Sequence, residues 1–189
     1  MLTDVQKSKL DRRFELLDAD GDGFITAADY DLAAAHVCEA FDFAGGSPQH
    51  ERIHVIYLRL WAALSRKTDP DGSGRITREQ FVQSCAESIV EPERGYDRVI
   101  RPVAQTIFDL IDEDDSGTLE VEELANWANA YGVCADDAEQ AFRALDRNGD
   151  GVLDLDEVQQ ALKEFYTSDD PEAPGNRIFG PLPVVAASH

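Results

Sequence analysis

The stretch "DRNGDGVLDLDE" (146–157) decides the fold of this 189-residue chain. Oxygen-bearing side chains occupy its positions 1, 3, 5, 9 and 12, in Asp146, Asn148, Asp150, Asp154 and Glu157. Position 6 is glycine, which permits a sharp bend, so the short side chains of a tightly wound loop can point toward one centre. The spacing predicts a loop that holds a hard cation in a shell of oxygen atoms, with the backbone carbonyl of position 7 as a further ligand.

Three other segments repeat this plan: "DADGDGFITAAD" (18–29), "DPDGSGRITREQ" (69–80) and "DEDDSGTLEVEE" (112–123). Each begins with Asp, carries oxygen-bearing side chains at positions 3 and 5, and has Gly at position 6 and Ile or Leu at position 8. The pattern is that of the twelve-residue EF-hand calcium loop, and four copies in one chain make it very specific. The apolar position 8 predicts that the loops pair through short strands, with this side chain buried between them.

Three of the four loops have a full set of ligands. The predicted metal ligands are Asp18, Asp20, Asp22, Phe24 (through its carbonyl) and Asp29 in the first loop; Asp112, Asp114, Ser116, Thr118 (carbonyl), Glu120 and Glu123 in the third; and Asp146, Asn148, Asp150, Val152 (carbonyl), Asp154 and Glu157 in the fourth. Each of these loops supplies four carboxylates, so we expect three bound calcium ions. Asp29 is one methylene shorter than the usual Glu at position 12. It either binds through one oxygen, which favours magnesium at the first site, or draws the outgoing helix inward and chelates with both oxygens, so that this site behaves like the others.

The second loop is weaker. Its candidate ligands are Asp69, Asp71, Ser73, Arg75 (carbonyl) and Gln80, with only two carboxylates and a neutral side chain at position 12. Pro70 also disfavours a helical conformation at the residue before it, where the incoming helix should finish. Two interpretations stay open: a weak calcium site, or a retained loop that stays empty and pairs structurally with the first. We favour the second interpretation.

Helical periodicity around the loops predicts an all-α fold of four helix-loop-helix units in two pairs. The expected helices cover residues 3–17, 27–43, 49–67, 78–91, 97–111, 121–130, 136–145 and 155–166. We expect an N-terminal pair over residues 1–92, a C-terminal pair over 93–168, and a non-helical tail over 169–189. Ile178, Phe179 and Leu182 are the predicted anchors of this tail on the body of the protein.

Composition limits the partners. The net charge of -21 attracts cations and repels nucleic acid and anionic membrane surfaces. No run of about 18 apolar residues is present, and the charged start lacks a signal-peptide pattern, so we expect a cytoplasmic protein. We also expect a monomer. Cys38, Cys85 and Cys134 are far apart and form no CxxC pair, which predicts small buried side chains without a redox or zinc role.

The segment "HERIH" (50–54) matches the H-E-x-x-H motif of zinc peptidases. Such an enzyme needs a third metal ligand, and no clear candidate lies downstream apart from the calcium loops and their helices. Arg52 also stands where these motifs usually carry an apolar residue. We therefore interpret His50 and His54 as two residues at the edge of a helix face, and we expect no enzyme.

The chain resembles the sarcoplasmic calcium-binding protein family and its calerythrin-like bacterial branch. The resemblance covers nearly the whole chain and rests on the four loops, the long early spacing, the degenerate second loop and a tail that reads "PEAPGNRIFGPL". It implies a compact fold of two paired EF-hand halves, binding of calcium and magnesium, and a buffering role. Coelenterazine-binding photoproteins and luciferin-binding proteins share this fold.

Three functions compete. A calcium sensor usually exposes a groove rich in methionine, and this chain has one Met, the first residue. We therefore favour a calcium buffer, with a sensor of another surface type as the alternative and an unknown protein partner. A carrier of an apolar ligand is the third function, for which Trp61, Trp127, Tyr57 and Tyr131 are candidate cavity residues, although core packing is the more common role of such aromatics.

Overall fold

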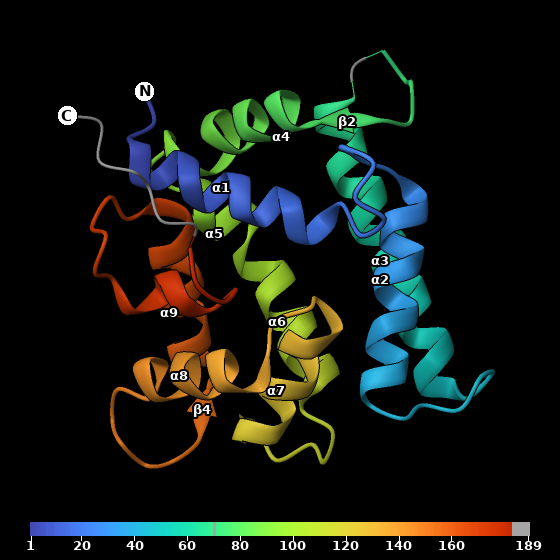
Figure 1. Ribbon diagram of the computed structural model, residues 1–189, viewed down its shortest axis with the longest axis vertical. Helices are drawn as coiled ribbons and strands as arrows, with labels where there is room; N and C mark the ends of the chain where they lie inside the picture. Colours follow the sequence, from blue (N-terminus) through green and yellow to red (C-terminus); the bar gives the residue numbers. More distant parts are fainter. Residues whose placement is uncertain (70, 183–189) are drawn as a thin grey trace.

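The computed structural model describes residues 1–69 and 71–182 and shows a helical protein (Figure 1). The α-helices are α1 (Asp4–Leu17), α2 (Ala27–Ala40), α3 (Pro48–Thr68), α4 (Arg78–Cys85), α5 (Gly95–Val99), α6 (Arg101–Ile111), α7 (Val121–Ala130), α8 (Ala135–Leu145) and α9 (Leu155–Thr167). A π-helical segment, η1 (Ala86–Val90), continues α4, and a 3-10 helix, η2 (Pro174–Arg177), follows α9. The predicted all-α class is confirmed.

The four predicted loops pair in two short antiparallel ladders. β1 (Phe24–Ile25) pairs with β2 (Ile76–Thr77), and β3 (Thr118–Leu119) pairs with β4 (Leu153–Asp154). The position-8 residues face one another, Ile25 against Ile76 and Leu119 against Leu153, and all four are fully buried. The predicted pairing through position 8 is therefore confirmed, and the first loop pairs with the second.

The helix that leaves each loop begins inside the loop. Position 9 is the N-cap and position 12 is the third helical residue, and together they form a capping box in all four units: Thr26 with Asp29, Thr77 with Gln80, Glu120 with Glu123, and Asp154 with Glu157. A capping box satisfies backbone N–H groups that a helix start leaves without partners. The position-12 residue of each capping box is thus also a predicted or candidate metal ligand, as is the position-9 residue in the third and fourth loops.

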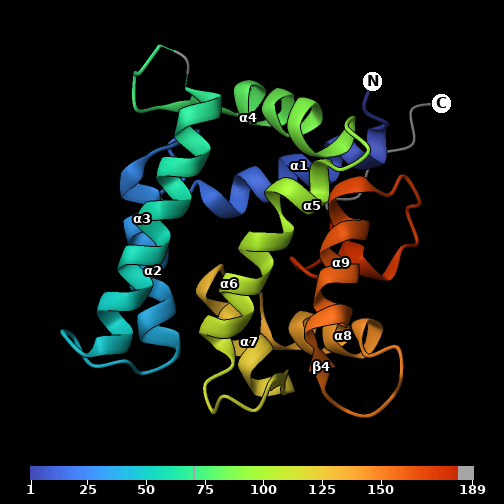
Figure 2. The same ribbon diagram turned by 180° about the vertical axis from the view of Figure 1, so that it is seen from behind.

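One hydrophobic cluster runs through the molecule from Leu10 to Phe179. α1 packs against both α4 and α9, α2 packs against α3 and α7, and α6 lies between these groups (Figure 2). Ile178 and Phe179 are buried in this cluster, and Leu182 packs against its edge. The division at residues 92 and 168 stays a prediction, and residues 183–189 of the expected tail lie outside the described part of the chain.

The structure differs from the prediction in several places, including the π-helical segment η1 within the expected helix 78–91. The expected helix 97–111 is two helices separated at Ile100, because Pro102 lacks the N–H that would continue the ladder. α2 ends at Ala40, and Asp42 takes a positive φ of 53°. The segment after α9 contains the 3-10 helix η2. Cys134 is exposed, whereas Cys38 and Cys85 are buried as expected.

No helix within the described residues combines the length and apolar character needed to cross a membrane.

Candidate metal centres

The same hydrogen bond closes all four loops. The carboxylate at position 1 accepts a hydrogen bond from the amide of the glycine at position 6. The four bonds, from the first loop to the fourth, are Gly23 to Asp18 (3.0 Å), Gly74 to Asp69 (2.7 Å), Gly117 to Asp112 (2.9 Å) and Gly151 to Asp146 (3.1 Å). These glycines have φ between 74 and 88°, a region that side chains with a Cβ rarely adopt. Glycine at position 6 therefore allows each loop to close around its first carboxylate.

Positions 3 and 5 continue this pattern. The side chain at position 3 accepts from the amide of position 5, and the side chain at position 5 accepts from the amide of position 7. These bonds hold the three short side chains of each loop on its inner side. Asp69, Asp71 and Ser73 of the second loop have the same arrangement as their counterparts, so this loop keeps the geometry despite its poorer ligands.

Position 12 connects the exit helix to the start of the loop. One carboxylate oxygen of Glu123 accepts from the amide of Glu113 over 2.8 Å, and Glu157 accepts from the amide of Arg147 over 2.9 Å. The shorter Asp29 instead meets the amide of Asp20, one residue further along its loop, over 3.3 Å. Gln80 accepts from Thr77 over 2.8 Å, and position 2 of its loop is a proline, which has no amide proton to donate.

The first and third loops bring carboxylates together as a cation would require. One oxygen each of Asp18, Asp20 and Asp22 lie within 4.8 Å of one another, as do those of Asp112, Asp114 and Glu123. Among the described residues, the fourth loop shows no such group of three carboxylates, and the amide oxygen of Asn148 occupies its position 3. The donor set in all three loops consists of oxygen atoms, which suits calcium and magnesium.

Two further observations indicate that these loops favour a positive charge. Oδ1 of Asp18 is buried and has no hydrogen-bond partner among the described residues, and leaving such an atom unpaired is costly. Burial raises the pKa of Glu123, and the neighbouring carboxylates Asp112 and Asp114 raise it further, against the amide bonds that lower it. A bound divalent cation would satisfy the first oxygen and would reverse the repulsion at the second.

The second loop reaches across to the first. A terminal guanidinium nitrogen of Arg75 lies 3.3 Å from Oδ2 of Asp22, and the guanidinium carbon lies 3.8 Å from the centre of the Phe24 ring. Asp22 is a predicted ligand of the first site. The predicted role of Arg75 concerned only its backbone carbonyl, because the sequence of one loop carries no signal for what its side chain contacts in another loop.

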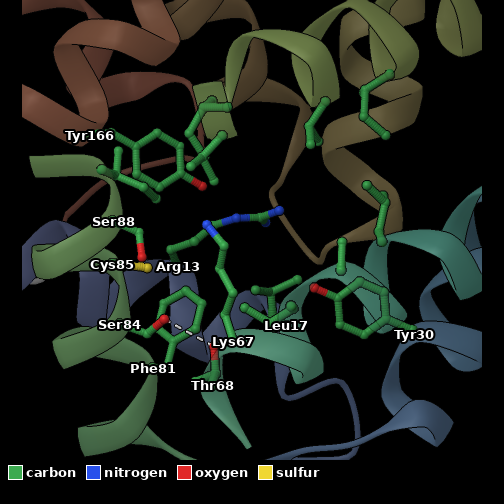
Figure 3. Close-up of a pocket in the computed structure, with 18 of the residues that line it drawn as sticks. Arg13, Leu17, Tyr30, Lys67, Thr68, Phe81, Ser84, Cys85, Ser88 and Tyr166 are labelled. Atoms are coloured by element: carbon green, nitrogen blue, oxygen red, sulfur yellow. Dashed lines mark hydrogen bonds between the residues drawn. The ribbon is translucent and has the colours of Figure 1, made fainter. Parts of the chain in front are cut away.

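A separate cavity of about 340 Å³ lies between the helices. Its lining includes Arg13 of α1, Tyr30 of α2, Tyr57 of α3, Trp127 of α7 and Tyr166 of α9. In Figure 3 the side chain of Arg13 reaches into the cavity between Tyr30 and Tyr166. Nε and Nη1 of Arg13 and Nε1 of Trp127 are buried without hydrogen-bond partners among the described residues. Most of the surrounding wall is apolar, and these donors add to its other polar groups, among them Lys67, Thr68 and Ser84.

Three of the four aromatic residues predicted from the sequence as cavity residues do line this cavity. Trp127, Tyr57 and Tyr131 line it, and the hydroxyl groups of the two tyrosines are 2.8 Å apart. Trp61 does not line it and instead packs against Tyr30, with ring centres 5.9 Å apart. Arg13 was missed because an arginine in a charged amphipathic helix is normally a surface residue.

Comparison with known proteins agrees with this geometry. Residues 101–163 match the family described as an EF-hand domain pair, and residues 10–30 match a single EF hand. Calerythrin of Saccharopolyspora erythraea is 30% identical over 167 residues, which cover 88% of this chain and 94% of calerythrin.

Two solved structures show the same fold. A calcium-binding protein of Streptomyces coelicolor, whose structure is described as the basis for prokaryotic calcium-mediated regulation, is 31% identical and has a TM-score of 0.71 over 87% of this chain and 99% of that chain. The sarcoplasmic calcium-binding protein of amphioxus is 18% identical and has a TM-score of 0.71 over 97% of this chain and 100% of that chain.

Proposed function

This chain belongs to the EF-hand calcium-binding proteins related to calerythrin, and on that premise we propose that it is a calcium buffer of the cytoplasm. The observation that carries the proposal is the convergence of carboxylate oxygens inside closed loops, with the buried, unpaired Oδ1 of Asp18 as its clearest sign. Calcium occupies the first, third and fourth loops, through the ligands predicted from the sequence, and magnesium competes at the first. The second loop supports the first through the β1–β2 ladder and stays empty.

A closed apolar core supports a buffer over a sensor. Among the described residues, the exposed large hydrophobic side chains are Met1, Val55, Leu58 and Val121, which lie on the N-terminus, α3 and α7. A sensor needs an apolar groove that calcium uncovers for a partner. The alternative, a calcium sensor, has its support in the regulation named for the Streptomyces relative.

Calorimetry and an apolar dye test this proposal together. Titration with calcium should give three bound ions, and addition of millimolar magnesium should weaken binding mainly at one of them. A dye that fluoresces on apolar surface should show no rise when calcium is added to the magnesium-loaded protein. A large rise would favour the sensor, and four strongly bound calcium ions would show that the second loop is a functional site.

The cavity supports a second candidate function, the carriage of a lipophilic anion. The unpaired nitrogens of Arg13 offer a charge-assisted hydrogen bond to a carboxylate, and the apolar wall accepts a hydrocarbon or ring system. A long-chain fatty acid is a suitable probe, because binding beside Trp127 should change its fluorescence. Arg13→Met should weaken binding at least about tenfold by removing this bond, whereas Arg59→Met on the exposed face of α3 should not.

A further inference from the structure

The segment "HERIH" has a third partner that lies upstream of it. Sγ of Cys38 and one ring nitrogen each of His50 and His54 lie within 4.8 Å of one another. Cys38 belongs to the last turn of α2, and the two histidines belong to the first two turns of α3. Cys38 precedes the motif in the sequence, whereas the third ligand of a zinc peptidase of this type is expected after it.

Helix packing explains why the three side chains meet. His50 and His54 are four residues apart on one face of α3, and their ring centres are 4.6 Å apart. α2 and α3 run side by side as a hairpin, so the end of α2 lies beside the beginning of α3 (Figure 1). Both helices have their calcium loops at the opposite end of this hairpin, which places the cluster apart from the predicted calcium sites.

The donor atoms suit a different class of metal from the calcium loops. Thiolate sulfur and imidazole nitrogen are ligands of zinc and related transition metals, whereas calcium and magnesium take oxygen. In a tetrahedral zinc site with ordinary bond lengths, neighbouring ligand atoms are roughly 3.4–3.7 Å apart. The three atoms observed within 4.8 Å therefore need to close by only about 1 Å, which side-chain rotation can supply.

Asp31 completes the arrangement on the other side of His54. Its Oδ1 lies 2.9 Å from Nδ1 of His54. A carboxylate on one ring nitrogen fixes the imidazole tautomer and leaves the other nitrogen as the metal ligand, an arrangement that recurs around histidine-bound zinc. His54 is thereby oriented before any metal arrives.

We propose that Cys38, His50 and His54 bind a zinc-class transition-metal ion at the end of the α2–α3 hairpin, with Asp31 as the residue that orients His54. Three protein ligands leave a fourth position for water or for a group from a partner. The site is not a peptidase centre of the H-E-x-x-H type, because the first ligand is a cysteine from another helix and Glu51 is exposed on α3. The chain would then bind hard and soft cations at separate places.

Cobalt is the probe, because a bond between Co²⁺ and thiolate gives a charge-transfer band in the near ultraviolet. The untagged, full-length protein is first saturated with calcium, so that the EF-hand loops are filled, and Co²⁺ is then added. The band should appear, saturate at one equivalent of Co²⁺, and disappear when Zn²⁺ displaces it. Absence of the band in the wild-type protein would overturn the proposal.

Matched variants assign the ligands. Cys38→Ser and His54→Gln should both lose the band, and Asp31→Asn should retain it but weaken Co²⁺ binding about tenfold or more. Cys134→Ser, at an exposed cysteine on another element, and His36→Gln, at another histidine of α2, should bind Co²⁺ like the wild type. A band that survives Cys38→Ser, or one that Cys134→Ser removes, would contradict the assignment. Calcium titration of each variant checks its fold. If Cys38→Ser does not fold, loss or survival of the band in His54→Gln decides whether the proposed site binds Co²⁺.

Discussion

Arg75 should weaken calcium binding at the first site, and its removal should strengthen it. The guanidinium lies 3.3 Å from Oδ2 of Asp22, a predicted ligand, and stacks 3.8 Å from the ring centre of Phe24. A cation at that place competes with calcium for the carboxylate and repels the bound ion. Arg75→Gln keeps a polar side chain with part of the aliphatic stem and removes the charge.

The expected gain in calcium affinity follows from how exposed the side chains of Arg75 and Asp22 are. Arg75 and Asp22 have side-chain exposures of 52% and 43%, so water screens the interaction. An exposed ion pair contributes about 0.2–1 kcal/mol. At a distance of roughly 6 Å, the repulsion between one positive charge and a dication in water is about 1.4 kcal/mol before salt screening, and about half of that at physiological ionic strength. The lost ion pair and the screened repulsion together contribute about 1 kcal/mol to the free energy of calcium binding. Arg75→Gln should therefore tighten calcium binding at the first site about fivefold.

Calorimetry on a background that isolates the first site measures this effect. Glu123→Gln and Glu157→Gln give the third and fourth loops the neutral position 12 that the second loop already has. Arg75→Lys is the matched control, because it keeps the charge and should bind calcium nearly like the wild type. The gain in Arg75→Gln should shrink in 0.5 M salt, where the screening length is only about 4 Å. Equal affinities in Arg75→Gln and Arg75→Lys would refute the electrostatic argument.

Three further predictions concern metal selectivity, metal removal and pH. Asp29→Glu should raise calcium affinity at the first site and weaken magnesium competition there. Calcium titration with and without millimolar magnesium measures this, and equal competition in Asp29→Glu and the wild type would show that side-chain length does not set the selectivity. Chelation of all metal should lower the melting temperature by at least about 10 °C, because each site filled at a hundred times its dissociation constant adds about 2.7 kcal/mol, and coincident melting curves would contradict this. Burial raises the pKa of Cys85 to about 12, above its unfolded value near 8.5, so its contribution to stability is complete below about pH 8.5 and is lost as pH rises toward 12. Urea unfolding at pH 8 and pH 10.5 should therefore show a smaller alkaline loss for Cys85→Ala than for the wild type, and equal losses would exclude this thiol as the cause.

Local patterns predicted the loops and most of the helices because both depend on residues close together in sequence. Position 8 predicted the Ile25–Ile76 and Leu119–Leu153 pairs, since its apolar side chain has no other place to be buried. The break at Ile100 was within reach of the same reasoning, because Pro102 stands two residues later. The assignment of individual metal ligands stays a prediction that titration of variants has to test.

Contacts between distant segments were not predictable from these patterns. Lys9, an ordinary polar residue in the sequence of α1, is fully buried and donates to the carbonyls of Glu164 and Ser168 over 2.9 and 2.7 Å. Its side chain ties the first helix to the end of the last one. Arg75 beside Asp22 and Cys38 beside His50 are of the same kind, because each pair depends on how two helices or loops pack and not on spacing along the chain.

The calcium loops and the cavity share helices, so their binding free energies should be coupled. Arg13 lies on the helix that enters the first loop, Tyr30 directly follows Asp29, and Phe81 directly follows Gln80, and all three line the cavity. If calcium drew the side chain of Asp29 toward the loop, the first turn of α2 would shift with it, and we would expect Tyr30 to shift in the cavity wall. Linkage requires that a ligand in the cavity change calcium affinity by the same factor by which calcium changes affinity for the ligand. The proposed buffer and carrier functions are therefore compatible in one molecule. A fatty acid that binds without any change in calcium affinity would show that α2 does not couple the cavity to the first loop.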